Sequence, residues 1–192
     1  LTSDRLFVSG NSYSGVHDTR FSVVRYGNVM GSRGSVIPFF LSIQKDQVFP
    51  ITDNRMTRFM ISLEGGVELV WDAFKDMQGG EIYVKKIPSM KLTDIALAVN
   101  KNAKHEIIGI RPGEKIHEQM IGPDDAHYTY EYGKYYKILP SINDWSDDPD
   151  RIGLGVKVGD DFTYSSDNNN DWMSSEELKR WIKNNPNNIG NF

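Results

Sequence analysis

Residues 21–35 read FSVVRYGNVMGSRGS, and this stretch indicates the fold class. Its first part, Phe21–Tyr26, is short, largely apolar and bounded by turn residues, so it predicts a buried strand. The three glycines that follow predict a loop, because glycine is common where the backbone turns sharply. A helix is then expected over about 36–45, with Ser35 as its cap.

Strands and helices continue to alternate outward from this unit. The helical spacing of Leu63, Val67, Val70 and Phe74 predicts a helix over Leu63–Asp76. The further elements expected are an extended stretch near 48–52, a strand at 81–84, a helix after Ser89, a strand at 105–110 and a helix near 115–121. This alternation predicts an α/β protein.

The two ends differ from this middle part. Leu1–Tyr13 is interpreted as the end of a helix that begins further upstream, because its apolar residues follow no start signal. From about Asp124 the sequence becomes aromatic, polar and loop-rich. The spacing Ser174-x-x-Glu177 predicts a capping box at the start of a last helix, and Asn184–Phe192 is expected to fray.

The composition limits the classes of function. The 192 residues carry a net charge of −4 with a pI of about 5.6, whereas a general nucleic-acid-binding protein needs a basic face. The chain holds no cysteine, which excludes a disulfide scaffold, a thiolate metal site and a cysteine nucleophile. Its longest apolar run, residues 36–41, is too short to span a bilayer. We therefore expect a cytoplasmic protein with no nucleic-acid or membrane partner.

Polar residues in three places could bind an anionic ligand. The glycine-rich loop carries Asn28 and Arg33 beyond the carboxyl end of the predicted strand, where open α/β sheets usually bind ligands. Arg55 and Arg58, three residues apart, could bind a diphosphate with their planar guanidinium groups.

The third place is a predicted strand-to-helix junction that carries Arg111 and Glu114. The arginine could donate to a phosphate, and the carboxylate could accept from ribose hydroxyls. Spacing alone leaves simpler interpretations open for all three places: glycines that only shape a turn, arginines that lie on the surface, and a glutamate that caps a helix.

Motifs typical of other enzymes are absent from the sequence. The loop spacing is G-x-x-x-G-x-x-G, and neither the dinucleotide-binding G-x-G-x-x-G nor a phosphate-binding P-loop occurs. A G-x-S-x-G elbow and a zinc-type histidine pair are missing as well. The spacing Tyr-x-x-x-Lys occurs once, over Tyr130–Lys134, in the polar region rather than on a core helix. These observations predict no metal site and identify no catalytic motif in this chain.

Five longer blocks carry a specific resemblance. They span residues 19–40, 51–59, 86–91, 109–118 and 164–169. Together they resemble the inverting UDP-N-acetylglucosamine 4,6-dehydratases, extended short-chain dehydrogenases of bacterial surface-polysaccharide synthesis and flagellin glycosylation. The resemblance covers about residues 1–183. One departure is Lys85, where the family commonly has proline, and we interpret it as a surface-type change.

The resemblance implies the fold. The chain is expected to be the carboxy-terminal part of an NAD(P)-binding Rossmann-type extended short-chain dehydrogenase, with the smaller mixed α/β substrate-binding lobe. Residues 1–48 would end the Rossmann domain and carry the substrate loop, residues 49–140 would form the lobe, and residues 141–192 would form a loop-rich tail with the last helix. The catalytic Tyr-x-x-x-Lys and the cofactor-binding glycine loop would precede Leu1.

The resemblance also implies the reaction. The longer polypeptide would convert UDP-N-acetylglucosamine into a UDP-4-keto-6-deoxy-N-acetylhexosamine, with inversion at carbon 5. Its cofactor would be NADP, bound mainly by the amino-terminal half, so this chain alone is expected to be inactive. The full-length protein is expected to be a homo-oligomer.

By resemblance, this chain supplies the substrate side of the site. Arg58, Arg111 and Glu114 would hold the diphosphate and ribose, Val29 would contact the nicotinamide end of NADP, and the role of Arg55 stays open. The expected substrate-binding residues are Asn28, Arg33, Gly34, Ser35, Val36, Ile37, Thr52, Arg58, Arg111 and Glu114.

Two alternatives remain open. A nucleotide-sugar 4-epimerase of the same superfamily would share the fold and the cofactor, and its product would keep the mass of the substrate. The chain could also be a non-catalytic remnant or binding module. Without an amino-terminal half, strand edges and apolar surface would be exposed, so the isolated chain is expected to be marginally stable or prone to aggregate.

Overall fold

The computed structural model describes residues 2–46, 48–142 and 145–190. The chain forms two compact units whose segments alternate along the sequence. Unit 1 comprises residues 1–26, 64–86 and 120–164, and unit 2 comprises residues 27–63, 87–119 and 165–192. The divisions after residues 48 and 140 that the sequence suggested do not coincide with these boundaries, because each unit is assembled from segments that are distant in sequence.

Unit 1 is built on a five-stranded sheet with the order β1-β5-β10-β9-β11. The first two strands are parallel and the other three continue the sheet in antiparallel pairs. The strands are β1 (Val23–Arg25), β5 (Ile82–Lys85), β9 (Thr129–Glu131), β10 (Tyr135–Ile138) and β11 (Val156–Lys157). The helices are α1 (Thr2–Tyr13), α3 (Leu63–Asp76, in this unit from Glu64), α5 (Pro123–Ala126), η1 (Trp145–Asp147) and α6 (Pro149–Ile152).

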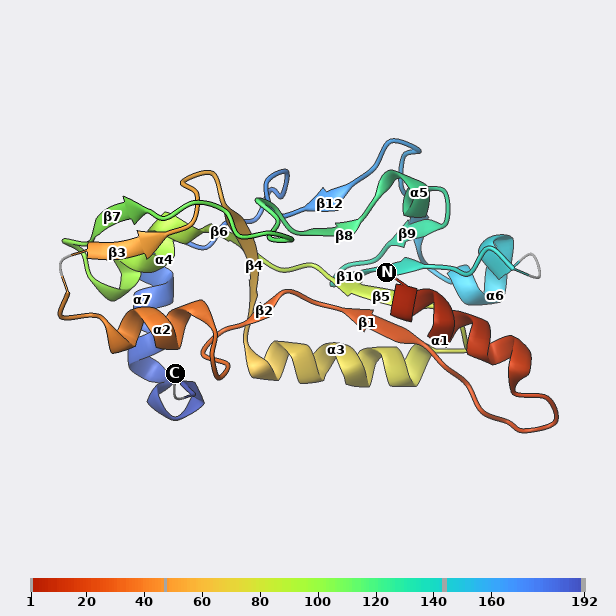
Figure 1. Ribbon diagram of the computed structural model, residues 1–192. Coiled ribbons are helices and arrows are strands. Elements are labelled where there is room, and N and C mark those ends of the chain that lie inside the picture. The colour runs from red at the N-terminus through yellow and green to blue at the C-terminus, as the bar shows by residue number, and fades with distance from the viewer. Residues whose placement is uncertain (1, 47, 143–144, 191–192) are drawn as a thin grey trace. The chain divides into compact units, whose positions relative to one another are not determined.

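Helix α3 directly precedes β5 in the chain and packs on this sheet (Figure 1). Its Leu69 and Ala73 contact Tyr83 of β5, and all three side chains are buried. The Tyr83 hydroxyl donates to Asp76 Oδ2 at 2.7 Å, and Lys137 Nζ donates to the same oxygen at 2.9 Å. Hydrogen bonds of this kind compensate for the burial of polar atoms beside an apolar core.

The other face of α3 is apolar and exposed. The stripe that identified this helix in the sequence, from Leu63 to Phe74, has side chains that are 46% to 69% exposed. Lys85 of β5, interpreted from the sequence as a surface-type change, is instead buried. Its Nζ lies 2.9 Å from Glu68 Oε2 of α3, and this ion pair compensates for burial of the ammonium group.

Unit 2 contains a three-stranded sheet, β2-β4-β6, and a parallel pair, β3-β7. The strands are β2 (Asn28–Val29), β3 (Val48–Ile51), β4 (Thr57–Ile61), β6 (Ser89–Lys91) and β7 (Lys104–Ile107). The helices are α2 (Val36–Ser42), α4 (Leu92–Val99), α7 (Ser175–Asn184) and η2 (Pro186–Asn188). Two further short strands, β8 (Gln119–Ile121) and β12 (Tyr164–Ser165), lie where the chain passes between the units.

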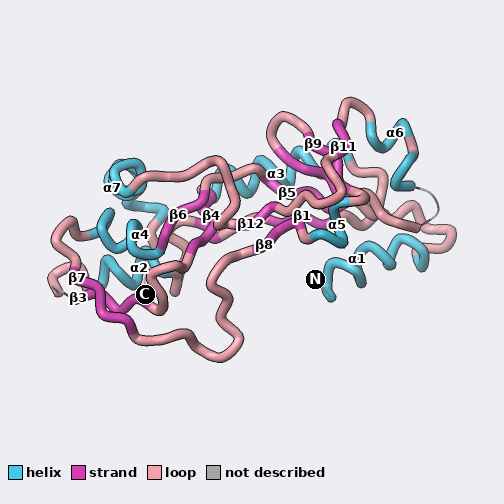
Figure 2. The backbone as a smooth tube through the Cα atoms, turned by 90° about the horizontal axis from the view of Figure 1, so that it is seen from above, coloured by secondary structure: helices cyan, strands magenta, loops and turns pink. Residues whose placement is uncertain are grey.

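The core of unit 2 lies among its helices and short strands. Both ribbon views show α2, α4 and α7 gathered beside β3 and β7 (Figures 1 and 2). Their buried side chains form one apolar cluster that includes Phe40 of α2, Phe49 of β3, Ile95 of α4 and Leu178 of α7. The rings of Phe40 and Phe49 meet edge to face with centroids 5.4 Å apart.

Most of the predicted elements are confirmed. The strand over Phe21–Tyr26 is β1, and the helix over Leu63–Asp76 is α3 with the same bounds. The helix that Ser89 was expected to start is α4, which begins at Leu92 because Ser89–Lys91 form strand β6. The capping box is present, since Ser174 Oγ accepts from Glu177 N and the Glu177 carboxylate accepts from Ser174 N. Among the described residues, none of the helices is both long and apolar enough to cross a lipid bilayer.

The predicted helix near residues 115–121 is wrong. Its backbone is hydrogen-bonded to other segments: the Ile116 carbonyl accepts from Thr57 N at 3.1 Å, and the Glu118 carbonyl accepts from Ser166 N at 2.8 Å. Residues 119–121 form strand β8. Groups that a helix would pair internally are therefore paired with neighbouring segments.

The prediction that Asn184–Phe192 frays is also wrong for residues 184–190, while residues 191–192 lie outside the described residues. The segment contains η2, and Gly190 N donates to Gly31 O at 2.7 Å. A Cβ on Gly31, whose φ is +77°, would lie 2.5 Å from Asn188 O. The carboxy-terminal segment thus packs against the glycine-rich loop, and glycine is required at this contact.

Candidate functional site

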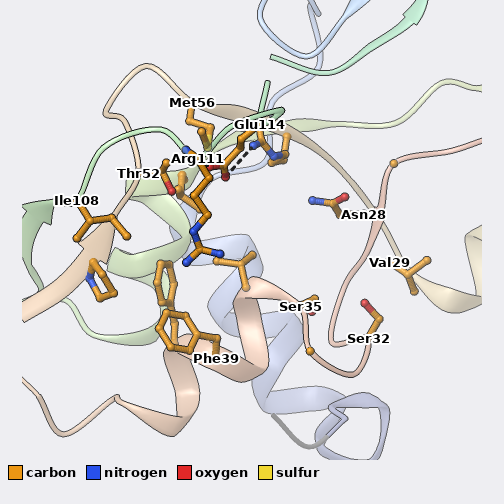
Figure 3. A pocket seen from close by; sticks show the side chains of 17 residues that line it. Asn28, Val29, Ser32, Ser35, Phe39, Thr52, Met56, Ile108, Arg111 and Glu114 are labelled. Atoms are coloured by element: carbon orange, nitrogen blue, oxygen red, sulfur yellow. Dashed lines mark hydrogen bonds and ion pairs between the residues drawn. The ribbon is translucent and has the colours of Figure 1, made fainter. Parts of the chain in front are cut away.

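Unit 2 contains a cavity of about 610 Å³ between the glycine-rich loop and the segments that follow β3 and β7. Figure 3 shows Asn28 and Ser35 on one side of this cavity and Arg111 and Glu114 on the other. The lining residues are Gly27, Asn28, Val29, Ser32, Gly34, Ser35, Val36, Phe39, Phe40, Pro50, Thr52, Met56, Arg58, Leu92, Ile108, Arg111 and Glu114.

The loop side of the cavity depends on close backbone packing. Gly27 lies against β4 so tightly that an added Cβ would be 2.6 Å from Phe59 O. This contact allows β2 to pair in parallel with β4, and the pairing positions Asn28 opposite Met60. Ser35 precedes α2 but its side chain does not cap the helix, and within the described chain its buried Oγ has no hydrogen-bond partner. A polar ligand group in the cavity could satisfy this oxygen.

Arg58 is the more buried of the two cationic groups in the cavity. Its side chain is only 14% exposed, and Nη1 donates to Thr57 O at 2.7 Å and to Ile116 O at 2.9 Å. Nη2 lies 3.9 Å from Glu114 Oε1, and Nε lies 3.9 Å from Glu118 Oε1. These two distances permit ion pairing but exceed hydrogen-bond length. Nη2, beside the lining residue Glu114, therefore keeps donors for a ligand in the cavity.

Arg111 reaches the cavity from a turn. Glu114 N donates to Arg111 O at 3.0 Å, and Arg111 N donates to Glu114 Oε2 at 3.2 Å. Gly113 has a φ of +82°, a conformation that glycine adopts without strain. Because Glu114 also lies beside Arg58, this one carboxylate connects the turn to the more buried guanidinium.

Glu118 lies behind the cavity wall and carries a perturbed carboxyl group. Burial raises its pKa above 4.5, although a hydrogen bond from Phe59 N (2.8 Å) and the charge of Arg58 act in the opposite direction. Desolvation disfavours the charged form of a carboxyl group, which explains the direction of this shift.

Nine of the eleven predicted ligand-binding residues line the cavity. They are Asn28, Val29, Gly34, Ser35, Val36, Thr52, Arg58, Arg111 and Glu114. The other two are Arg33, which is exposed on the loop, and Ile37, which is 1% exposed in the core. Arg55 does not line the cavity either, because its guanidinium pairs with Asp53 Oδ2 at 2.8 Å. Binding by these residues stays a prediction.

Several lining residues had not been singled out in the sequence. They include Ser32, Phe39, Pro50, Met56 and Ile108. Ser32 lies within the glycine-rich loop and Met56 between the two arginines, so both were near a recognised motif. The apolar residues carried no signal, because an apolar side chain that lines a cavity looks the same in sequence as one in the core.

The described residues offer little to hold a metal or a dinucleotide. They contain no group of three or more histidine, aspartate or glutamate side chains that could hold a metal ion. The loop with glycines at 27, 31 and 34 lacks the spacing of a dinucleotide-binding loop. Val29, at the end of β2, is the cavity residue that the resemblance assigns to a cofactor. The residues of this loop therefore fit the edge of a cofactor site and not its main phosphate-binding part.

The chain is similar to known proteins over most of its sequence. The sequence profile of the family described as "Polysaccharide biosynthesis protein" matches residues 1–140. The chain is 56% identical to "UDP-N-acetylglucosamine 4,6-dehydratase (inverting)" of Campylobacter jejuni over 93% of its length, and it covers 55% of that protein. It is 41% identical to the UDP-glucose 4-epimerase of Rickettsia bellii over 62% of its length, covering 37% of that protein.

A solved structure has the same fold. Pen from Bacillus thuringiensis matches 96% of this chain with a TM-score of 0.81 and 34% identity, over 56% of its own length. This match confirms the predicted fold, the carboxy-terminal part of an extended short-chain dehydrogenase. The chain spans about half the length of the curated dehydratases it matches, in their carboxy-terminal portion, and the predicted resemblance to them is confirmed. The chain belongs to the polysaccharide biosynthesis protein family.

Proposed function

We propose that this chain is the substrate-binding portion of an inverting UDP-N-acetylglucosamine 4,6-dehydratase. One observation carries the proposal: Arg58, Arg111 and Glu114 converge on one cavity in a chain that is 56% identical to such an enzyme. The cavity volume of about 610 Å³ lies within the range of about 300–1,000 Å³ that accommodates small ligands.

The chemistry of the lining supports a sugar nucleotide. Two guanidinium groups supply donors for a diphosphate, and the Glu114 carboxylate supplies acceptors for ribose hydroxyls. The amide of Asn28 and the unpaired hydroxyl of Ser35 offer polar contacts on the loop side. Phe39 and Ile108 supply apolar surface, as small-molecule sites usually do.

The proposed reaction removes one molecule of water. Carbon 4 of the sugar is oxidised by loss of a hydride and of its hydroxyl proton, and the proton on carbon 5 and the hydroxyl on carbon 6 leave as water. The hydride then adds to carbon 6 while a proton adds to carbon 5, where the configuration is inverted. NADP, when bound, supplies the hydride acceptor and donor, and Val29 lies at the edge of the cavity assigned to its nicotinamide end. Arg58, Arg111 and Glu114 bind and orient the sugar nucleotide. The residues that transfer protons are not assigned to this chain, so we propose that it is inactive alone.

The runner-up function is a nucleotide-sugar 4-epimerase. The chain is 41% identical to a UDP-glucose 4-epimerase, which supports this function. The support is weaker than that for a dehydratase, to which the chain is 56% identical. The two reactions differ in product mass, because dehydration removes water and epimerisation removes nothing. A cytoplasmic location and a homo-oligomeric state of the full-length protein remain predictions.

The test uses the complete gene product that contains this chain, incubated with UDP-N-acetylglucosamine and analysed by mass spectrometry. We expect a product that has lost one water. A product of unchanged mass would establish epimerisation instead, and no product would contradict both assignments.

The kinetics of the same reaction test the role of Arg111, with Arg55 as the comparison. Arg111→Ala should raise KM by about ten- to a hundredfold, because it removes a charge-assisted contact worth about 1.5–3 kcal/mol. Arg55→Ala is the matched control: this exposed arginine pairs with Asp53 outside the cavity, so its KM should stay near that of the wild type. Equal effects of the two substitutions would contradict the role of Arg111.

A further inference from the structure

Two buried hydroxyl groups and one partly buried imidazole form a hydrogen-bonded cluster next to Arg58. We define the hydroxyl cluster as Thr57, Ser166 and His117. Thr57 is 3% exposed and Ser166 is fully buried. Thr57 Oγ1 lies 2.6 Å from Ser166 Oγ and 2.8 Å from His117 Nδ1. The three residues come from distant parts of the chain, so the cluster joins three segments of unit 2.

Short hydrogen bonds join the groups of this cluster. Glu118 N donates to Ser166 Oγ at 2.9 Å, and the Ser166 hydroxyl has two acceptors within reach, Thr57 O at 3.2 Å and Thr57 Oγ1 at 2.6 Å. Thr57 Oγ1 also pairs with His117 Nδ1. Both buried hydroxyls are therefore hydrogen-bonded, whichever of them donates in the bond that they share. A paired polar network of this kind fixes its backbone segments in one arrangement.

The backbone of the cluster holds the guanidinium of Arg58. The two carbonyls that accept from Nη1 belong to Thr57 and to Ile116, the residue before His117. Thr57 N also donates to Ile116 O at 3.1 Å, so these two carbonyls lie in a fixed relation. With Nη1 committed to them, the orientation of Arg58 depends on the positions of residues that the hydroxyl cluster joins.

We propose that Thr57 and Ser166 are positioning residues, which orient Arg58 so that its Nη2 faces the diphosphate of a sugar nucleotide. The inference rests on the proposed function of the cavity and names residues outside its lining. If the cluster only stabilises the fold, a substitution in it should have the same effect on UDP binding whether or not Arg58 is present. If the cluster positions Arg58, the substitution should no longer affect UDP binding once Arg58 has been removed.

The test is a double-mutant cycle on UDP binding to the complete gene product that contains this chain, by isothermal titration calorimetry, with thermal unfolding of each variant. Thr57→Val removes the hydroxyl and keeps the size of the side chain. We expect it to weaken UDP binding by about tenfold when Arg58 is present. In the Arg58→Ala background, Thr57→Val should cause no further loss. Thr57→Ser restores the hydroxyl and should restore the affinity.

Each outcome decides between the proposals. If the complete wild-type protein does not bind UDP, the proposed function of the cavity fails, and the positioning role fails with it. If the wild type binds UDP but Thr57→Val binds equally well, or the two substitutions act independently, only the positioning role is overturned. Should Thr57→Val fail to fold, Ser166→Ala takes its place in the same cycle with the same criteria.

Discussion

At the scale of single residues, Glu118 gives the structure a testable dependence on pH. Because burial raises its pKa above 4.5, the folded chain holds this proton more tightly than the unfolded chain does. The free energy of unfolding should therefore fall as pH rises from about 4.5 through the raised pKa. Glu118→Gln has no titrating group and keeps an oxygen that can accept from Phe59 N. We expect this substitution to stabilise the chain more at about pH 7 than at about pH 4.

Thermal unfolding of the wild type and of Glu118→Gln at both pH values measures this difference. Arg55→Ala serves as a control, because Arg55 pairs with Asp53 and makes no contact with Glu118. The same shift in Tm at both pH values would show that burial of Glu118 does not perturb its titration.

Arg55 and Arg58 show how far a sequence predicts a site. Three residues apart in one motif, they looked equally suited to bind a phosphate. The structure separates them: the first pairs with Asp53, whose pKa it lowers to about 2, and the second turns into the cavity. The partners that orient Arg58 include Ile116, 58 residues away, and Thr57 meets Ser166 across 109 residues. No local pattern predicts such contacts.

At the scale of secondary structure, α7 depends on its capping box. Ser174 Oγ accepts from Glu177 N, and the Glu177 carboxylate accepts from Ser174 N at 2.8 Å. The helix that begins here buries Leu178 in the core of unit 2. We expect Ser174→Ala to lower the free energy of unfolding by about 1 kcal/mol, as loss of an N-cap usually does.

Chemical denaturation of the variant measures this loss. Ser175→Ala is the matched control, since Ser175 is the first residue inside the helix and has no capping role. It should change the free energy of unfolding by no more than about 0.5 kcal/mol. Similar losses for both variants would mean that the capping box does not stabilise α7.

Helices with their own start signals and periodicity were predictable, as α3, α4 and α7 show. The segment near residues 115–121 was not, because its backbone pairs with Thr57 and Ser166 and not with itself. The buried face of α3 was not predictable either. Two faces of α3 are apolar at helical spacing: the one with Leu69 and Ala73, and the stripe from Leu63 to Phe74. Packing against the sheet determines which of these faces is buried.

At the scale of the whole molecule, unit 1 exposes surface of a kind that folded proteins usually cover. β1 is an edge strand of its sheet, and a parallel edge is seldom left open. Leu6 and Phe7 of α1 are 69% and 55% exposed. Trp71 and Phe74 of α3 are 57% and 69% exposed and contact each other edge to face. The curated dehydratases are nearly twice as long as this chain, so they have further residues with which to cover such surface.

We therefore expect the isolated chain to self-associate through the apolar face of α3. Sedimentation velocity should show an average mass that rises with protein concentration, and Trp71→Glu combined with Phe74→Glu should reduce this rise, because charge disfavours burial of the face. Leu154→Glu is the control: Leu154 is 96% exposed in a loop outside this face, and its substitution should leave association unchanged. A wild-type chain that stays monomeric at all concentrations would show that this face tolerates water. An equal effect of Leu154→Glu would show that added charge alone, and not α3, governs association.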